Sequence, residues 1–136
     1  MGNIRKKWPH ATWEFYISSK KDVKKLSNKQ FLANFLRDLP RAIKLHTIGK
    51  PLIHNFPEKN GVMTEGGITG FVLLSESDIT LHTWPEYGYG CIDIFACTQF
   101  DIKKAETKIK KTFGKGKYIR DLIYRGQIIP VAKSKK

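Results

Sequence analysis

A chain of 136 residues, 40% of them hydrophobic, has the length of one compact domain and excludes a large multidomain protein. No apolar run approaches the roughly 20 residues that cross a membrane. The basic residues at 5–7 precede Trp8, Pro9 and His10 rather than the apolar stretch of a secretory signal. These features predict a single domain, 1–136, in the cytoplasm and without a membrane partner.

The formal net charge of +13 would suit a polyanionic partner. The charge is uneven, because residues 50–100 hold two lysines and no arginine against six acids. The flanking lysines form runs at 20–25, 103–117 and 133–136, with few aromatic side chains among them that could stack on bases. A solvated lysine-rich face is the preferred interpretation, so nucleic acid is not expected as a partner, although a polyanion site stays open as the alternative.

The two cysteines, Cys91 and Cys97, lie in one apolar segment. They have neither CxxC spacing nor a companion cluster of histidines, so no disulfide framework and no metal site is predicted. Free thiols are expected.

The first half of the chain predicts a strand, a helix and a second strand. Residues 12–18 alternate aromatic and polar side chains, which is typical of a half-buried strand. From Ser27 as N-cap, apolar residues recur at spacings of three and four, which predicts an amphipathic helix that Pro40 should kink or end. A second strand is expected over 44–54 and a loop over 55–67.

The second half predicts more strands and one helix. Residues 67–84 are long enough for two strands, and 89–98 form another. One face of that strand would carry Cys91, Asp93, Phe95 and Cys97. A helix is expected over 101–112 with Asp101 as N-cap, then a last strand or strand pair over 117–129 and a disordered lysine tail. The order predicts an α+β fold, a two-layer sandwich of one antiparallel β-sheet with helices on one face.

Reactive side chains concentrate in one segment. Ser77 follows Glu76, with His82 five residues later, Glu86 four beyond that and Cys97 twenty after the serine. These residues could act as nucleophile, base, anion and proton donor. The serine lacks the glycines of a GxSxG motif, and no phosphate-binding loop is present. Residue types alone leave open whether this is a catalytic site or a chance grouping.

The same segment resembles a known family. Glu76 and Ser77, the string HTWPEYGY over 82–89, and then Asp93, Phe95 and Cys97 follow a pattern close to ESHIxxHTWPEYGYxxxDxFxC. That pattern is typical of bacterial and archaeal S-adenosylmethionine decarboxylases. The match is highly specific, and the rest of the chain agrees with the family in length and element order.

The resemblance implies a proenzyme that cuts itself between Glu76 and Ser77 into a β chain, 1–76, and an α chain, 77–136. Ser77 would become a covalent pyruvoyl group, with release of ammonia. Its ketone would form a Schiff base with the substrate amine and accept electrons as CO₂ leaves, so no external cofactor is expected. The product would be the aminopropyl donor of spermidine biosynthesis. The family's active site lies between two protomers, which implies a homodimer of αβ units.

The resemblance also assigns roles to single residues. His82 matches the processing histidine and Cys97 the proton donor. Glu86 matches the carboxylate that binds the ribose hydroxyls, and Thr69 takes the place of a serine that assists processing. Each also has a purely structural interpretation. His82 could be a hydrogen-bonded histidine of the sheet and Cys97 a small buried thiol. Glu86 could be an ordinary exposed acid and Thr69 an ordinary strand residue. Trp84 is expected to pack rather than to contact the substrate.

Three features qualify the resemblance. A regular strand would put Ser77 and His82 on opposite faces, so a bulge or turn near the cleavage point is predicted. Asp78 stands where the family has histidine, which replaces a neutral or cationic group by an anion. The loop before Gly67 is longer than usual, which displaces Phe56 from the place of a phenylalanine that stacks on adenine.

Two alternatives therefore remain. The first is a pyruvoyl-dependent arginine or ornithine decarboxylase on the same scaffold, since loss of adenine contacts is what such a change of substrate needs. The acidic middle of the chain does not distinguish the substrates, because all three are cations. The second is an unprocessed protein that binds a partner or a polyanion through its lysine face.

Overall fold

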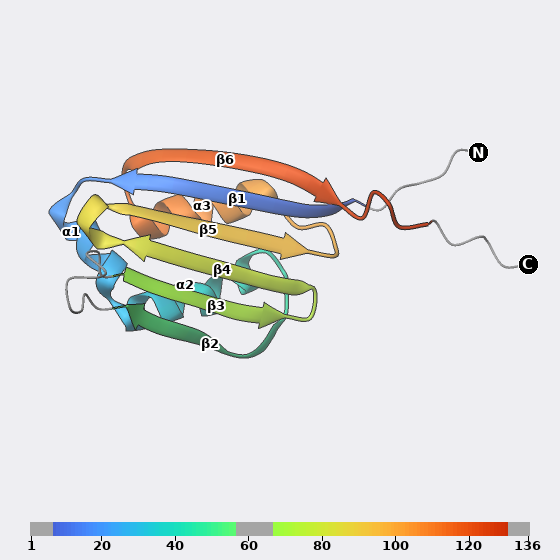
Figure 1. Ribbon diagram of the computed structural model, residues 1–136, viewed down its shortest axis with the longest axis horizontal. Helices are drawn as coiled ribbons and strands as arrows, with labels where there is room; N and C mark the ends of the chain where they lie inside the picture. The colour runs from blue at the N-terminus through green and yellow to red at the C-terminus, as the bar shows by residue number, and fades with distance from the viewer. Residues whose placement is uncertain (1–6, 57–66, 131–136) are drawn as a thin grey trace, which may run out of the picture.

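Six strands form one antiparallel sheet, and α2 and α3 cover one of its faces (Figure 1). The computed structural model describes residues 7–56 and 67–130. The strand order is β2-β3-β4-β5-β1-β6, and all neighbours are antiparallel. The elements are β1 (Trp8–Ile17), α1 (Lys20–Val23), η1 (Lys24–Ser27), α2 (Lys29–Ala42), β2 (Thr47–Phe56), β3 (Gly67–Leu74), β4 (Ser77–Trp84), η2 (Pro85–Tyr87), β5 (Tyr89–Ala96), α3 (Ile102–Phe113) and β6 (Gly116–Arg125). The predicted α+β class and two-layer arrangement are confirmed.

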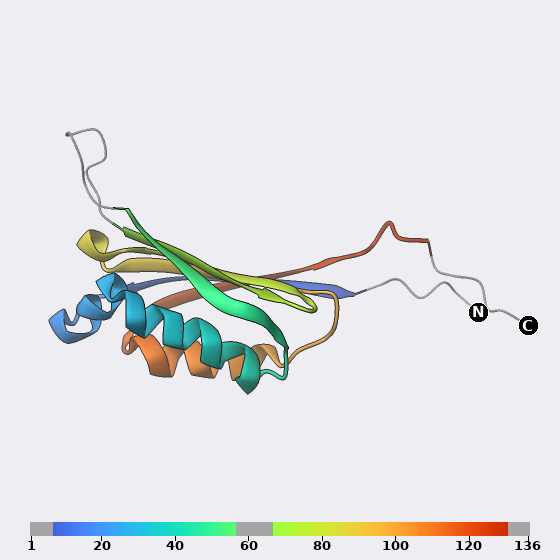
Figure 2. The same cartoon turned by 90° about the horizontal axis from the view of Figure 1, so that it is seen from below.

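The core lies between the helices and the sheet. On β1, the side chains of Ala11, Trp13, Phe15 and Ile17 alternate into it, because successive strand residues point to opposite faces. Phe15 stacks on Phe113 of α3 with ring centroids 4.7 Å apart. Removing such apolar surface from water stabilises the fold by roughly 25 cal/mol per Å². Figure 2 shows that both helices lie on the same side of the sheet and that the other side is uncovered.

Helix α2 differs from its prediction at both ends. Its N-cap is Asn28, whose side chain accepts the N–H of Phe31 at 3.0 Å, and Ser27 instead ends the 3₁₀ turn η1. Pro40 lies inside the last turn and the helix continues to Ala42. A proline removes only its own bond to residue i−4, so near a C-terminus the loss is small and Pro40 does not end the helix.

Strand β2 begins three residues after the start of the predicted strand 44–54 and ends two residues beyond it. Its register with β3 shifts between Ile48 and Leu52, where glycine and proline interrupt the pattern. Most of the predicted loop 55–67 lies outside the described residues, which omit 57–66.

The C-terminal third forms one helix and one strand. Asp101 is the N-cap of α3 as predicted, since its carboxylate accepts the N–H of Lys104 at 2.9 Å. The segment 117–129 contributes a single strand, β6, at the edge next to β1. The lysine tail at 133–136 lies outside the described residues. Within the described ranges, no helix has the length and apolar character to span a membrane.

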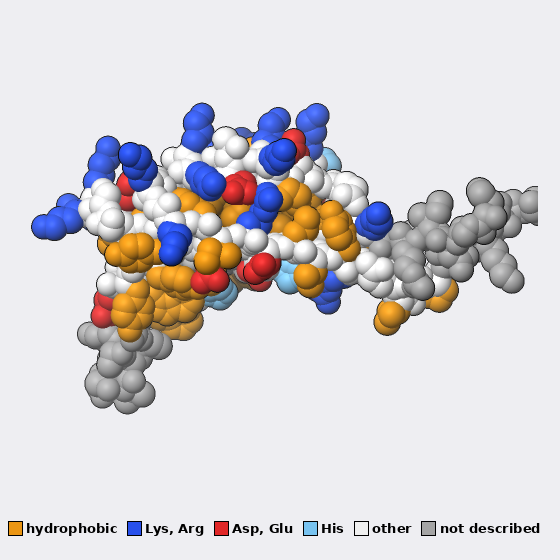
Figure 3. All heavy atoms as spheres, turned by 90° about the horizontal axis from the view of Figure 1, so that it is seen from above, with side chains coloured by type: hydrophobic (Ala, Val, Ile, Leu, Met, Phe, Trp, Pro, Cys, Tyr) orange, Lys and Arg blue, Asp and Glu red, His pale blue; other side chains and the backbone are white. Residues whose placement is uncertain are grey.

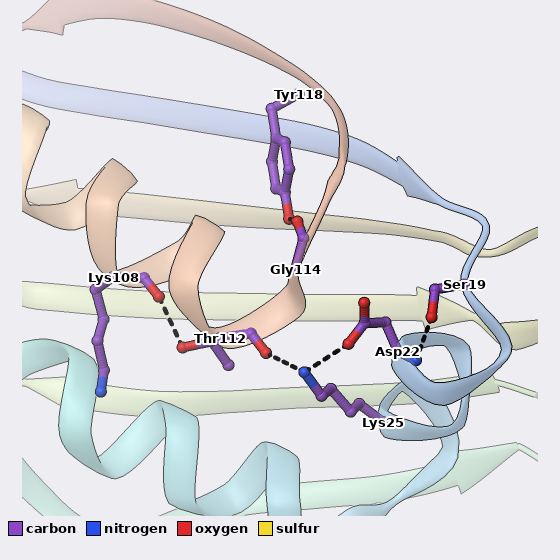
Figure 4. A network of polar contacts seen from close by, with 7 residues as sticks. All are labelled: Ser19, Asp22, Lys25, Lys108, Thr112, Gly114 and Tyr118. Atoms are coloured by element: carbon purple, nitrogen blue, oxygen red, sulfur yellow. Dashed lines mark hydrogen bonds and ion pairs between the residues drawn. The ribbon is translucent and has the colours of Figure 1, made fainter.

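A polar network joins the first helical turns to the C-terminal end of α3 (Figure 4). The Lys25 ammonium donates to the carbonyl of Thr112 at 2.9 Å and pairs with the Asp22 carboxylate at 2.8 Å. The Tyr118 hydroxyl donates to the carbonyl of Gly114 at 2.6 Å. The turn after β1 is thereby attached to the C-terminal end of α3.

Candidate active site

The hairpin between β3 and β4 carries the predicted cleavage point. Leu74 pairs with Ser77, so Ser75 and Glu76 alone form the turn. Ser77 has φ +146°, a backbone conformation that residues other than glycine rarely adopt. A turn is therefore present at the cleavage point, with backbone strain at Ser77. The pairing of β4 with both of its neighbours runs without a register shift from Ser77 to Thr83, so it contains no bulge that would put Ser77 and His82 on one face.

The carbonyl before Ser77 is held by a backbone N–H. The N–H of Cys97 donates to the carbonyl oxygen of Glu76 at 2.8 Å. A fixed donor on a carbonyl polarises it and stabilises negative charge that develops on its oxygen during attack. Cys97 itself is exposed and lies just beyond β5, which ends at Ala96. The strand predicted over 89–98 ends at Ala96, so Cys97 is not part of it.

The Glu76 side chain is held by a residue that sequence reasoning missed. Its carboxylate oxygens accept the backbone N–H of His46 at 3.0 Å and contact the His46 Nδ1 at 2.6 Å. Burial alone would raise the pKa of the Glu76 carboxyl, but the hydrogen bonds from His46 outweigh burial and hold that pKa below its usual value. His46 is 30 residues away in sequence and belongs to no motif, so no signal in the sequence indicates the contact.

Thr69 and His82 form a second group. They lie directly opposite each other on β3 and β4, and the Thr69 hydroxyl is 3.3 Å from the His82 Nδ1. A hydroxyl can hydrogen-bond either tautomer of the ring, so it can orient the imidazole for proton transfer. The two predicted processing residues are therefore in contact.

A cleft of about 200 Å³ lies beside this pair. Its lining comprises Phe56, Gly67, Ile68, Thr69, His82, Thr83 and Trp84. Phe56 thus lies at the cleft despite the long loop that follows it. Trp84 also lines the cleft, besides contacting the rings of His82 and Tyr89. Glu86 is exposed in η2, two residues beyond Trp84.

The two groups lie at opposite ends of β4. Five residues separate Ser77 from His82, which is about 17 Å along a strand at roughly 3.3 Å per residue. Their side chains also differ in strand parity: His82 belongs to the face opposite the helices, whereas Ser77 aligns with the buried Leu74 and Ala96. One chain therefore brings Glu76, Ser77 and Cys97 together but does not bring His82 to them.

The thiol of Cys91 has a different environment from that of Cys97. Cys91 lies opposite His82 on the neighbouring strand and is half-buried. Burial, reinforced by the carboxylates of Asp93 and Glu14, raises the pKa of the Cys91 thiol to about 11. Both cysteines are free thiols, as predicted.

The face of the sheet opposite the helices is rich in exposed apolar side chains. We call it the open face. Figure 3 looks onto the β6 edge: lysine and arginine side chains gather over the helix side and this edge, and hydrophobic side chains gather towards the open face. Its large exposed hydrophobic residues are Tyr16, Ile48, Leu52, Phe56, Leu73, Ile119 and Ile123. Among the described residues, the carboxylates of Glu14, Asp78, Asp93 and Asp121 belong to this face too.

Comparison with known proteins identifies the family and the fold. The family model for S-adenosylmethionine decarboxylase matches residues 9–126, a range that contains every candidate site residue described above. The fold is also that of a solved relative: the crystal structure of the adenosylmethionine decarboxylase from Aquifex aeolicus VF5 superimposes with a TM-score of 0.72. That superposition covers 97% of this chain and 100% of the other, at 22% sequence identity.

Curated relatives match along most of their length. The S-adenosylmethionine decarboxylase proenzyme of Clostridium botulinum (strain Langeland) is 35% identical over 104 residues, which is 76% of this chain and 83% of the relative. The proenzyme of Acidithiobacillus ferrooxidans (strain ATCC 53993) is 31% identical over 108 residues, which is 79% of this chain and 75% of the relative. Because the family model and these relatives span most of the sequence, the chain belongs to the S-adenosylmethionine decarboxylase family and is an enzyme.

Proposed function

We propose that this chain is a proenzyme that cleaves itself between Glu76 and Ser77 and then decarboxylates S-adenosylmethionine with the pyruvoyl group formed from Ser77. The observation that carries the proposal is the pairing of a strained serine with a held carbonyl: Ser77 has φ +146°, and the Cys97 N–H donates to the carbonyl of Glu76 at 2.8 Å. Backbone strain at Ser77 and a preorganised donor both favour attack on that carbonyl.

The cleavage can be written with its atoms balanced. The Ser77 hydroxyl loses its proton to a base and its oxygen attacks the Glu76 carbonyl carbon, while the Cys97 N–H stabilises the charge on oxygen. The C–N bond breaks and the amine takes a proton, which leaves an ester. A base then removes the Ser77 α-proton and Glu76 leaves as the C-terminal carboxylate of the β chain. Water hydrolyses the remaining enamine through its imine tautomer, which releases ammonia and leaves the pyruvoyl group.

We propose that the base in this cleavage is His82 of a second copy of the chain. Within one chain, His82 is about 17 Å along β4 from Ser77, as the strand rise requires. Two sheets packed by their open faces about a two-fold axis perpendicular to the strands would run in opposite directions, so the Ser77 end of one β4 would lie near the His82 end of the other. Because Ser77 has the strand parity of the helix side, attack also requires its side chain to turn towards the open face.

The open face supports this dimer. Its exposed hydrophobic residues include Leu52 at 63%, Ile123 at 57% and Ile48 at 53% of their surface. Exposed apolar side chains gathered on one face of a sheet often mark an interaction site. Burial of the open face in a homodimer of αβ units would cover these residues and complete two identical sites.

The cleft beside His82 has groups that suit S-adenosylmethionine. The aromatic rings of Phe56 and Trp84 offer stacking surfaces for adenine, and the exposed Glu86 offers a carboxylate for the ribose hydroxyls. The carboxylates on the open face, among them Asp78, favour a cationic substrate. The pyruvoyl group supplies an electron sink for loss of CO₂, and the exposed Cys97 thiol supplies the proton that replaces it. The product is an aminopropyl donor for polyamine biosynthesis.

Two measurements test the proposal. The intact mass of the purified protein should show two chains that divide after Glu76, the second lighter by one ammonia than a peptide that begins with serine. CO₂ release should then be measured with carboxyl-labelled S-adenosylmethionine, arginine and ornithine. A chain of full-length mass that persists on long incubation would contradict the proposal. Release from arginine or ornithine alone would keep the pyruvoyl chemistry and change the substrate.

A further inference from the structure

Three contacts from His46 surround the turn of the scissile hairpin. The His46 N–H donates to the Glu76 carboxylate at 3.0 Å, the ring Nδ1 lies 2.6 Å from the other carboxylate oxygen, and the His46 carbonyl accepts the N–H of Ser75 at 2.8 Å. Both residues of the two-residue turn are thus held by one residue of the segment between α2 and β2.

The segment that carries His46 is itself well anchored. Leu45 is 5% exposed and its N–H donates to the carbonyl of Pro40 at 2.8 Å, which ties it to the last turn of α2. Thr47, the next residue, begins β2 and pairs with Leu74 at the end of β3. His46 therefore sits on a short segment that is fixed to the helix on one side and to the hairpin on the other.

Core packing does not account for the orientation of the ring. The His46 side chain is 73% exposed, whereas the Glu76 side chain is 15% exposed. An exposed ion pair usually adds little to stability, so this contact is a poor candidate for a purely structural role. It acts on the residue whose carbonyl must be attacked, next to a serine with φ +146°. A strained backbone of this kind persists only where neighbouring contacts hold it.

We propose that His46 is a positioning residue for self-cleavage: by holding the Glu76 side chain and the Ser75 N–H, it keeps the strained turn in the conformation in which Ser77 can attack the Glu76 carbonyl. This inference rests on the proposed function. The Cys97 N–H holds the carbonyl oxygen from one side, and His46 holds the rest of the residue from the other. The ring can donate from Nδ1 whether it is neutral or cationic, so its role does not require a change of charge.

The test follows cleavage of the full-length chain after cell-free synthesis. His46→Ala removes the ring contact and should slow cleavage about three- to tenfold, as expected for one charge-assisted hydrogen bond that water partly screens. His46→Asn should stay within about twofold of the wild-type rate, because its side-chain amide can donate from the position of Nδ1. Arg120→Ala is the matched control, since it removes an exposed ion pair with Glu106, at 2.7 Å, on the other side of the molecule.

Hydroxylamine shows whether His46 acts on formation of the ester, and melting temperatures show whether the substitution has a general effect on stability. It cleaves esters and leaves amides intact, so it releases the β chain as soon as the ester has formed. If His46 acts on ester formation, hydroxylamine should not restore the wild-type rate to His46→Ala. Melting temperatures of the same variants in the uncleavable Ser77→Ala background should agree within a few degrees.

The outcomes are distinct. A wild-type chain that stays whole overturns the proposed function and this inference with it. If the wild-type chain cleaves and His46→Ala cleaves at the same rate, the inference is overturned and the proposed function stands. Equal slowing in the alanine and asparagine variants, or full rescue of His46→Ala by hydroxylamine, also overturns it.

Discussion

The backbone N–H of Cys97 donates a 2.8 Å hydrogen bond to the carbonyl oxygen of Glu76. This bond joins the end of β5 to the turn of the β3–β4 hairpin, so one residue serves the candidate site in two ways. Its backbone holds the carbonyl that is attacked in the proposed cleavage, and its exposed thiol is available as a proton donor. Because the two roles use different atoms, substitution of the side chain can separate them.

We expect Cys97→Ala to cleave itself within about threefold of the wild-type rate, because the N–H remains. Its decarboxylation should fall by about 10²-fold or more, the usual contribution of a positioned proton donor. Intact mass gives the cleaved fraction, and CO₂ release from the cleaved protein gives the activity. Cys91→Ala is the matched control and should retain both within about twofold. A Cys97→Ala chain that stays whole would show that the thiol takes part in cleavage.

Two inactive variants should rescue each other if the site is shared between copies. Ser77→Ala lacks the nucleophile and His82→Ala lacks the base, so neither should cleave alone. In a mixed dimer, one site combines Ser77 of the His82→Ala chain with His82 of the Ser77→Ala chain. Co-expression should therefore cleave the His82→Ala chain specifically, which intact mass can identify. Absence of cleavage in isolated mixed dimers would contradict a shared site.

Gly114 is expected to be sensitive to substitution. It has φ +96°, and an added Cβ would collide with the Asp22 carboxylate that pairs with Lys25. Gly114→Ala should destabilise the fold by about 2–4 kcal/mol, because φ +96° with ψ −167° is a conformation open almost only to glycine, at a cost of about 1–3 kcal/mol, and the carboxylate must also be displaced. Gly49→Ala is the matched control: its φ is +73° with nothing within 4 Å, so only the strain is expected. Urea unfolding in the Ser77→Ala background measures both, and equal losses would argue against the collision.

The two thiols should differ in their reaction with iodoacetamide. The thiolate is the reactive form, and burial beside carboxylates raises the pKa of Cys91 to about 11. Below that pH the thiolate fraction falls tenfold per unit, so Cys91 should react negligibly at pH 8 and faster as pH rises towards 11. The exposed Cys97 should react first. Peptide mass mapping after short exposures measures both rates, and labelling of Cys91 at pH 8 as fast as Cys97 would contradict the shifted pKa.

The main elements could be predicted because local periodicity reports burial. The alternation that ends at Ile17 and the helical spacing of Leu32, Phe35 and Leu36 both describe faces that the structure buries. Boundaries were less predictable, since Asn28 rather than Ser27 caps α2 and β5 ends before Cys97. Such ends depend on which donors and acceptors the neighbouring segments supply.

The candidate site was predictable in its residues but not in its arrangement. Ser77, His82 and Cys97 came from one contiguous motif, because motif residues are readable in order along the chain. Thr69 came from its position eight residues before Ser77. The contact from His46 was not predictable, since a hydrogen bond across 30 residues exists only after α2 and β2 have been placed.

The sequence alone determined the types of reactive group and the hydrophobic patterns that select an α+β sheet with one covered face. The tertiary structure alone decided that Ser77 and His82 lie at opposite ends of β4, that Cys97 holds the Glu76 carbonyl, and that Ser77 adopts φ +146°. The physical reason is that residue chemistry and periodicity are local properties of a chain. Distance, strain and hydrogen-bond partners instead depend on how its distant segments pack.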